Sequence, residues 1–448
     1  MPMTQAFQSR NLLRKLLPSG AAIATATLSL LSPVLSSTVH ASLQDSPKVV
    51  LDEAWQIVNQ EYVDGSFNQV DWLAVRQDLL SREYSSREEA YTALRDALEQ
   101  LDDPYTRFMD PGQYEQLTRQ TSGELSGIGI RLRAAETTGA LTVLEPLPNS
   151  PATAAGIQAG DRILAINGRS TQGMSVNDAS ELIRGQVGTS VVLEIQRSGE
   201  TPFEVSITRA RIELPTVHYN LRQEGNYRIG YIRLTEFSSH AAEQMQRAIE
   251  DLLAQGVDAF VLDLRGNPGG LLYASIDISR MWVDAGAIVR TVDRIGNSEE
   301  IMATHSALTD LPLAVLVDGR SASSSEILTG ALMDNERATV VGSQTFGKAL
   351  VQQVHALSDG SGLAVTIAHY YTPDGTDISQ LGLTPDVTVD LSDSDRQRLS
   401  SNPALVATQA DPQYSGAISA LQESILAYRA RQETPQQVSV TQDMQVVD

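Results

Sequence analysis

The sequence contains no cysteine in its 448 residues. This absence excludes thiol catalysis, disulfide bonds and cysteine-ligated metals. Basic residues are also scarce: 33 lysines and arginines are outnumbered by 55 aspartates and glutamates, and the formal net charge is −22. Nucleic acids and anionic lipids favour basic protein surfaces, so neither is expected as a partner. The sequence has no H-E-x-x-H motif or other metal-ligand cluster, and no cofactor is expected.

Long hydrophobic runs are missing beyond residue 41, where no segment is long and apolar enough to span a bilayer. Before that point, Arg10, Arg14 and Lys15 precede the mildly apolar run LLPSGAAIATATLSLLSPVL, which is followed by VHAS. This pattern resembles a secretory signal peptide with cleavage after Ala41. The alternative is a membrane anchor, but two prolines and a glycine in the run argue against a stable span. We therefore expect an exported protein that works in water.

A chain of this length needs more than one core, and four regions follow the predicted signal peptide, residues 1–41. Residues 42–122 have helical spacing and end in LDDPYTRFMDP, which we expect to be a loop. Residues 123–212 hold short strand-like runs, residues 213–390 alternate between strands and helices, and residues 391–448 form a polar tail with one helical segment. The alternation predicts an α/β layer with largely parallel strands, so the expected fold class is multidomain α/β.

Four serines crowd into the stretch VDGRSASSSEILTG: Ser321, Ser323, Ser324 and Ser325. The structural interpretation is a helix start, because Ser323 followed three residues later by Glu326 matches a capping box. The catalytic interpretation makes one hydroxyl a nucleophile, and a serine nucleophile needs a base. Local pattern alone favours capping.

The usual base, histidine, occurs in no recognisable catalytic motif, and the sequence has no G-x-S-x-G elbow. His355 and His369 stay open as bases. The other candidate is Lys348 in GSQTFGKALVQQ, because a lysine buried among apolar groups loses its proton more easily. The alternative is a solvated loop lysine. Gln352 lies four positions on, roughly 13 Å away along a flat strand at about 3.3 Å per residue, so contact with Lys348 requires a turn.

A third stretch, DLRGNPGG, follows one predicted strand and precedes a helix. Gly269 and Gly270 leave backbone N–H groups free to point into open space, which suits an oxyanion hole. The alternative is an ordinary turn. All three stretches follow strands of one α/β layer, and ligands in such layers bind beyond the carboxyl ends of the strands.

The chain resembles a known family in seven stretches: LDDPYTRFMDP, AGIQAGDRILAING, YIRLTEF, LDLRGNPGG, GRSASSSEI, TFGKALVQ and YYTPDGTDISQLGLTPDV. They are similar to the carboxyl-terminal processing peptidases, serine proteases with a Ser-Lys dyad. The resemblance implies a crotonase-like, ClpP-like α/β protease core with an N-terminal helical domain and an inserted PDZ domain. It also implies Ser323 as nucleophile, Lys348 as base and Gln352 as a supporting residue.

In the same resemblance, the backbone N–H groups of Ser324 and of Gly269 or Gly270 stabilise the oxyanion. Two positions depart from the common pattern: Ser324 stands where alanine is usual, and Ala349 stands where glycine is usual. Within residues 123–212, Gly127, Ile128, Gly129 and Ile130 match the PDZ loop that holds a peptide C-terminus.

The N-terminal region is most similar to the cyanobacterial and chloroplast branch, which trims the precursor of a photosystem II reaction-centre subunit in the thylakoid lumen. The expected partner is therefore a protein with a free C-terminus, such as a membrane-protein tail, and the expected compartment is a periplasm or thylakoid lumen. Two rival hypotheses are a PDZ adaptor with an inactive protease core and a crotonase-like acyl-CoA enzyme. The intact dyad argues against the first, and an acidic exported chain argues against the second.

Overall fold

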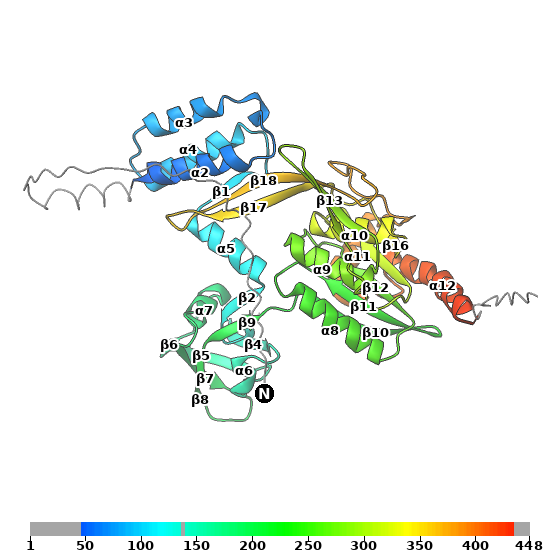
Figure 1. Ribbon diagram of the computed structural model, residues 1–448. Helices are drawn as coiled ribbons and strands as arrows, with labels where there is room; N and C mark the ends of the chain where they lie inside the picture. Colours follow the sequence, from blue (N-terminus) through cyan, green and yellow to red (C-terminus); the bar gives the residue numbers. More distant parts are fainter. Residues whose placement is uncertain (1–45, 136–138, 434–448) are drawn as a thin grey trace, which may run out of the picture.

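The structure is a computed structural model that describes residues 46–135 and 139–433 (Figure 1). The predicted signal peptide and the end of the predicted tail lie outside these described residues. Within the two described ranges, no helix is long and apolar enough to cross a membrane.

The central sheet lies in the C-terminal half of the chain. Its six strands lie in the order β10 (Val217–Glu224), β11 (Tyr227–Leu234), β12 (Ala259–Asp263), β15 (Leu313–Val317), β16 (Thr339–Gly342) and β19 (Val387–Thr388). β10 and β11 form an antiparallel hairpin, and each later pair is parallel. The prediction of an α/β layer with largely parallel strands is therefore confirmed.

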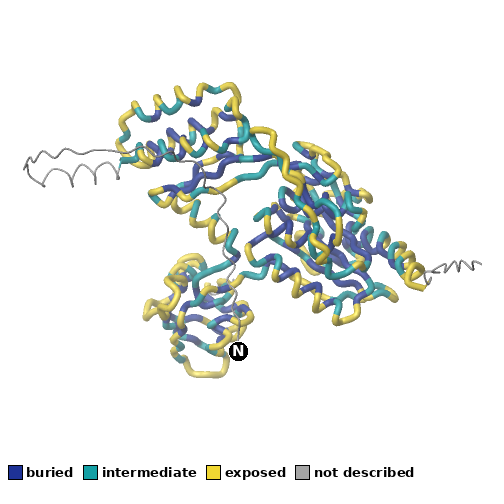
Figure 2. The backbone as a smooth tube through the Cα atoms, viewed as in Figure 1, coloured by how far each residue is buried: buried dark blue, intermediate teal, exposed yellow. Residues whose placement is uncertain are grey.

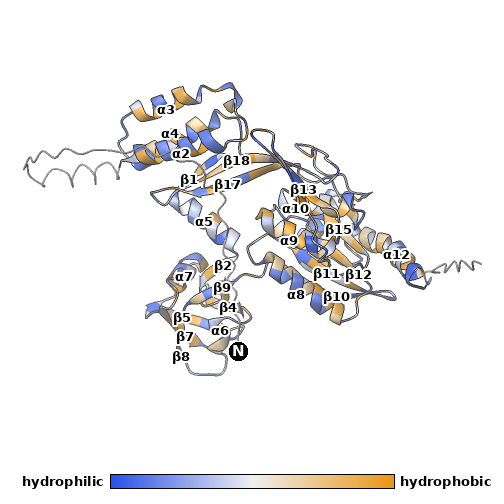
Figure 3. Ribbon diagram, viewed as in Figure 1, coloured by the Kyte–Doolittle hydropathy of each residue, from blue (hydrophilic) through white to orange (hydrophobic). Residues whose placement is uncertain are grey.

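Helices cover both faces of the central sheet. One face packs against α8 (Ala241–Ala254), α9 (Leu272–Trp282) and α10 (Ser324–Asp334), and the other packs against α12 (Pro412–Glu433). The short α11 (Asp393–Ser401) and η2 (Pro403–Leu405) connect β19 to α12. Figures 2 and 3 show the strands between these helices as buried and rich in hydrophobic residues. Burial on both faces explains the continuous apolar runs of β12 and β15.

A second sheet, here called the cap sheet, carries the N-terminal helices. It contains β1 (Arg107–Met109), β18 (Gly362–Tyr371), β13 (Ala287–Asp293), β14 (Ser298–Met302) and β17 (Leu350–Ala356). An apolar cluster joins it to α2 (Pro47–Glu61), α3 (Trp72–Ser81), α4 (Arg87–Glu99) and the short η1 (Phe67–Gln69). The prediction that LDDPYTRFMDP is a loop was wrong for β1. This strand forms by pairing with β18, far away in the sequence, and three residues are too few for a local pattern to reveal.

The region that resembles a PDZ domain lies at the end of helix α5 (Pro111–Ser122), which leads to it from β1 (Figure 1). Its sheet contains β3 (Ile130–Ala134), β4 (Leu141–Pro146), β5 (Arg162–Ile166), β6 (Arg169–Ser170), β7 (Ser190–Gln196) and β8 (Phe203–Thr208). Its helices are α6 (Pro151–Ala154) and α7 (Val176–Ile183). The chain enters and leaves through the paired strands β2 (Glu124–Gly127) and β9 (Ala210–Glu213). A separate apolar cluster fills its interior.

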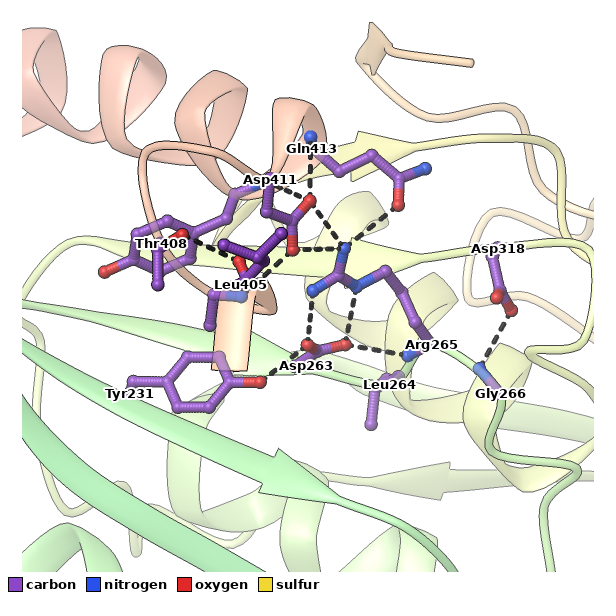
Figure 4. A network of polar contacts seen from close by, with 12 residues as sticks. Tyr231, Asp263, Leu264, Arg265, Gly266, Asp318, Leu405, Thr408, Asp411 and Gln413 are labelled. Carbon is purple, nitrogen blue, oxygen red and sulfur yellow. Dashed lines mark hydrogen bonds and ion pairs between the residues drawn. The ribbon is translucent and has the colours of Figure 1, made fainter. Parts of the chain in front are cut away.

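A buried ion-pair network ties the C-terminal segment to the end of β12 (Figure 4). The Arg265 guanidinium lies 2.7 Å from Asp263 Oδ2 and 2.9 Å from Asp411 Oδ2, and both carboxylates are fully buried. Tyr231 donates to Asp263, and Gln413 accepts from Arg265. Burial would raise the pKa of Asp263, but Arg265 holds it below its ordinary value. The network therefore fixes the strand end from which the DLRGNPGG loop departs.

We predict that Arg265→Ala lowers the free energy of unfolding by roughly 3–5 kcal/mol, because it leaves two buried carboxylates without their cation. Urea unfolding followed by tryptophan fluorescence, to which Trp282 in the core of the central sheet contributes, measures this change. The matched control is Arg320→Ala, whose side chain is 81% exposed beside Asp318 and whose loss is expected to cost less than about 0.5 kcal/mol. Equal stability of the two variants would contradict the prediction.

Candidate active site

One cavity brings the predicted nucleophile and the predicted base together. It has a volume of about 430 Å³, and Ser323, Lys348, Gln352, Ser324 and Gly270 all line it. Residues of β1, α5, β17 and β18 supply one wall, and the starts of α9 and α10 supply the other. The cavity therefore lies where the cap sheet meets the carboxyl ends of the central strands, as expected for an α/β layer.

Ser323 lies directly before α10 with an unusual backbone conformation. Its φ is 55° and its ψ is −114°, a region that side-chain-bearing residues rarely occupy. Backbone strain of this kind is concentrated at functional sites. The conformation sets Ser323 at the edge of the cavity, at the N-terminus of α10.

The other three serines of the cluster have buried side chains that bond to one neighbouring loop. Ser321 donates to the Leu264 carbonyl, Ser324 to the Gly270 carbonyl and Ser325 to the Asn267 carbonyl, at 2.9–3.0 Å. These bonds hold the DLRGNPGG loop against the start of α10. The hydroxyls of these three serines therefore donate to backbone carbonyls, which distinguishes them from Ser323.

Lys348 is half-buried at the other side of the cavity. Its pKa is lowered to about 8: burial is the largest cause, the positive charge of Arg107 also lowers the pKa, and Asp103 and Glu326 act in the opposite direction. Its ammonium nitrogen lies 4.5 Å from the centre of the Tyr105 ring. The pKa allows a substantial neutral fraction at mildly alkaline pH, which a general base requires.

A buried carboxylate links the backbones of Ser323 and Lys348. Glu326 is fully buried and accepts hydrogen bonds from the Ser323 N–H at 2.8 Å and from the Lys348 N–H at 3.0 Å. It also accepts from the Gly347 N–H and the Thr345 hydroxyl, both at 2.6 Å. One side chain therefore fixes the serine loop and the lysine loop relative to each other.

Tyr370 makes a second link between the same two residues. Its hydroxyl donates to the backbone carbonyl of Lys348 and lies 3.2 Å from that of Ser323. Burial raises the pKa of Tyr370 well above its ordinary value, so the hydroxyl stays protonated and remains a donor. Glu326 therefore binds the backbone N–H groups of Ser323 and Lys348, and Tyr370 binds their backbone carbonyls.

The glycine loop packs directly against Ser323. A Cβ atom at Gly269 would lie 2.8 Å from the Ala322 carbonyl oxygen, and one at Gly270 would lie 2.4 Å from the Phe237 carbonyl oxygen, so only glycine allows this approach. The Gly269 N–H donates to Asn267 Oδ1 at 2.9 Å. Among the described residues, the N–H groups of Gly270 and Ser324 have no hydrogen-bond partner.

Three other predicted candidates lie in different surroundings. Gln352 lines the cavity from β17, where the pairing with β18 shifts register between Val351 and Gln352, and its amide nitrogen lies 3.4 Å from Thr366 Oγ1. His355 points toward the N-terminal helices, 2.8 Å from Glu61, and His369 is exposed on β18. Neither histidine lines the cavity, so of the three predicted bases only Lys348 lines it together with Ser323.

Gly127, Ile128, Gly129 and Ile130 line a separate groove beside α7. The groove is apolar along Leu132 and Ile183, and Arg184 lies at its rim. A Cβ atom at Gly127 would meet no atom within 4 Å, whereas one at Gly129, whose φ is +77°, would lie 2.3 Å from Ser150 Cβ. The loop therefore has the open backbone and apolar floor that a peptide C-terminus needs.

Sequence reasoning missed the roles of Glu326, Tyr370, Tyr105 and Arg107. The sequence pattern identifies Glu326 only as a capping partner, and its bonds to the loop Thr345–Lys348 depend on tertiary contact. The other three lie in stretches that carry the family resemblance. Tyr105 and Arg107 lie in LDDPYTRFMDP, and Tyr370 is the first residue of YYTPDGTDISQLGLTPDV. Their location in these stretches was the feature of the sequence that could have identified them as residues of the site.

Two parts of the chain match known protein families. The model of peptidase family S41 matches residues 228–389, which include Ser323 and Lys348, and a PDZ domain model matches residues 142–197. These matches confirm the expected α/β protease core with an inserted PDZ domain.

Relatives align over most of the chain. A carboxyl-terminal-processing protease of Synechocystis is 44% identical over 86% of this chain and 90% of the relative, and carboxyl-terminal-processing peptidase 2 of Arabidopsis thaliana chloroplasts is 38% identical over 81% and 74%. The solved photosystem II D1 C-terminal processing protease is 36% identical, with a TM-score of 0.52 over 82% of this chain and 99% of that one. The chain therefore belongs to the carboxyl-terminal-processing proteases of peptidase family S41, which are serine proteases.

Proposed function

We propose that Ser323 and Lys348 form the catalytic dyad of this protease. The observation that supports this assignment best is that both residues line one cavity while Glu326 and Tyr370 bind the backbones of both. Among the residues that the structure describes, Lys348 is the only lysine lining that cavity, and its pKa of about 8 suits a general base.

In the proposed mechanism, neutral Lys348 takes the proton from the Ser323 hydroxyl as Oγ attacks the scissile carbonyl carbon. The N–H groups of Ser324 and Gly270 donate to the developing oxyanion, because the Gly269 N–H is already bound to Asn267. Protonated Lys348 then donates to the leaving amine, and an acyl-enzyme remains. Water, deprotonated by Lys348, releases the new C-terminus and restores the serine.

Gln352 is proposed as a supporting residue, because it lines the cavity on the strand that follows Lys348. The groove formed by Gly127–Ile130 and α7 is proposed to bind the substrate C-terminus, whose carboxylate would accept backbone N–H bonds in the loop. Each substrate would then be cut upstream of the end that the PDZ domain holds.

The proposed substrate is a photosystem II reaction-centre precursor or a similar protein with a C-terminal extension. The solved relative carries the name of a D1 processing protease, and the similar plant peptidase is chloroplastic. We further propose that residues 1–41 direct export to a periplasm or thylakoid lumen. The proposed domains are 42–122 (helical), 123–212 (PDZ), 213–390 (protease core) and 391–448 (C-terminal helix and tail).

Ser323→Ala and Lys348→Ala are each expected to abolish peptide cleavage without unfolding the protein, because nucleophile and base act as a unit. Peptide cleavage followed by mass spectrometry, with circular dichroism as a folding check, tests this. The matched control is Ser325→Ala, which removes the bond to Asn267 and should keep substantial activity.

A fluorophosphonate probe should label wild type and not Ser323→Ala. A protein that is never labelled and never cleaves would favour the rival hypothesis of a PDZ adaptor. Equal loss of activity in Ser325→Ala and Ser323→Ala would make the choice within the cluster wrong.

The cleavage rate should rise with pH through a midpoint near the Lys348 pKa of about 8, because the neutral amine is the active form. Asp103 raises this pKa, so Asp103→Asn should move the midpoint to lower pH, while the asparagine oxygen can still accept the hydrogen bond from the Tyr105 N–H. The measurement is kcat/KM against pH for both proteins. A profile that falls between neutral and mildly alkaline pH would rule out a lysine base.

Amidating the C-terminus of a peptide substrate should reduce kcat/KM about tenfold or more, because the PDZ loop would lose charge-assisted bonds worth about 1.4 kcal/mol or more. Gly127→Val should reduce cleavage of the free acid by a similar factor and leave the amide little changed. Gly129 is unsuitable for this test, because a side chain there would collide with Ser150. Equal cleavage of acid and amide by wild type would show that the groove does not recognise the terminus.

A further inference from the structure

The charged side chains that line the catalytic cavity are of the opposite sign to the whole protein, although the carboxylates of Asp103 and Glu326, which do not line it, also act on Lys348. Its lining residues include two cations, Arg107 and Lys348, and within the described part of the chain they include no aspartate or glutamate. The full chain carries a formal charge of −22. Lys348 must be neutral when it acts as a base, whereas the guanidinium of Arg107 stays protonated. Arg107 is therefore the lining residue that keeps its positive charge during the reaction.

Arg107 has a fixed backbone and a free head group. It is the first residue of β1, where it pairs with Ala364 of β18, and Ala364 lines the same cavity. Its side chain is exposed, and across the described ranges the guanidinium has no hydrogen bond or ion pair. It lies close enough to Lys348 for its charge to lower the pKa of that lysine.

A second space adjoins Arg107. This smaller cavity, of about 270 Å³, shares Arg107 and Leu117 with the catalytic cavity. Its other polar lining residues are three glutamines of α5: Gln113, Gln116 and Gln120. Neutral amides can donate hydrogen bonds to a carboxylate without competing for Arg107 as an ion partner.

We propose that Arg107 is a specificity-determining residue that pairs with an acidic side chain of the substrate, a few residues from the scissile bond. A guanidinium offers two parallel donors that match a carboxylate. Because the terminal carboxylate of the substrate is proposed to bind in the PDZ groove, the carboxylate that pairs with Arg107 would belong to a side chain. The inference rests on the proposed function of Ser323 and Lys348, because their cavity defines where the substrate lies.

The test uses a cleavable peptide and a set of variants with a single aspartate or asparagine at each position within four residues of the cut. Wild type should cleave the aspartate peptide about fivefold to twentyfold better in kcat/KM at one or two positions, and high salt should reduce this preference. Arg107→Gln should lose the preference, Arg107→Lys should retain part of it, and Arg107→Glu should prefer lysine at the same position. Because each ratio compares two peptides with one enzyme, any change in the Lys348 pKa cancels.

The matched control is Arg119→Gln, which removes an arginine of α5 that pairs with Glu115 and lines neither cavity. It should keep the wild-type preference.

An unchanged preference in Arg107→Gln, or no preference in wild type at any position, would overturn the proposal while leaving the dyad intact. Cleavage of no peptide by wild type would instead overturn the proposed function and the inference with it. If Arg107→Gln does not fold, Arg107→Glu replaces it in the test, because an unchanged aspartate preference after charge reversal would also refute the pairing.

Discussion

The carboxylate of Glu326 is the constraint on which the catalytic geometry depends. A fully buried carboxylate is costly unless donors surround it, and here four donors from two separate loops converge on its oxygens. The cost of burial is thereby offset only when both loops are in place. Ser323 and Lys348, which lie in those loops, are held at one relative position as a consequence. The structural and catalytic interpretations of the serine cluster are therefore compatible, since Glu326 both completes the start of α10 and fixes the two residues of the proposed dyad relative to each other.

Much of the fold could be predicted because its signals are local. The alternation of apolar strands and amphipathic helices from residue 213 onward revealed the α/β layer, and glycine-marked strands revealed the region at 123–212. Ser323 and Lys348 could be singled out for the same reason, since each follows a strand in an unusual local composition, and the family resemblance then paired them.

The remaining features depend on contacts between distant segments. β1 exists because it pairs with β18, and Tyr105 reaches Lys348 only through that pairing. The sequence also could not show that the hydroxyls of Ser321, Ser324 and Ser325 bind the glycine loop, because that loop precedes them by more than a strand and a helix. Nor could it choose between Gly269 and Gly270 for the proposed oxyanion hole, because the hydrogen bond from the Gly269 N–H to Asn267 is visible only in the structure.

The pairing of β1 with β18 also has a consequence for how the protein matures. Strand pairs that join distant parts of a chain form late, because a large loop must close before any contact can compensate for the closure. Until β1 docks, Lys348 lacks the wall that shields it from water, and a hydrated lysine keeps its proton. With the proposed dyad, a nascent or partly unfolded molecule is therefore expected to be inactive as a protease, although its serine and lysine are both present. Such a coupling of activity to folding would protect the chain from digesting itself and its unfolded neighbours before its own folding is complete.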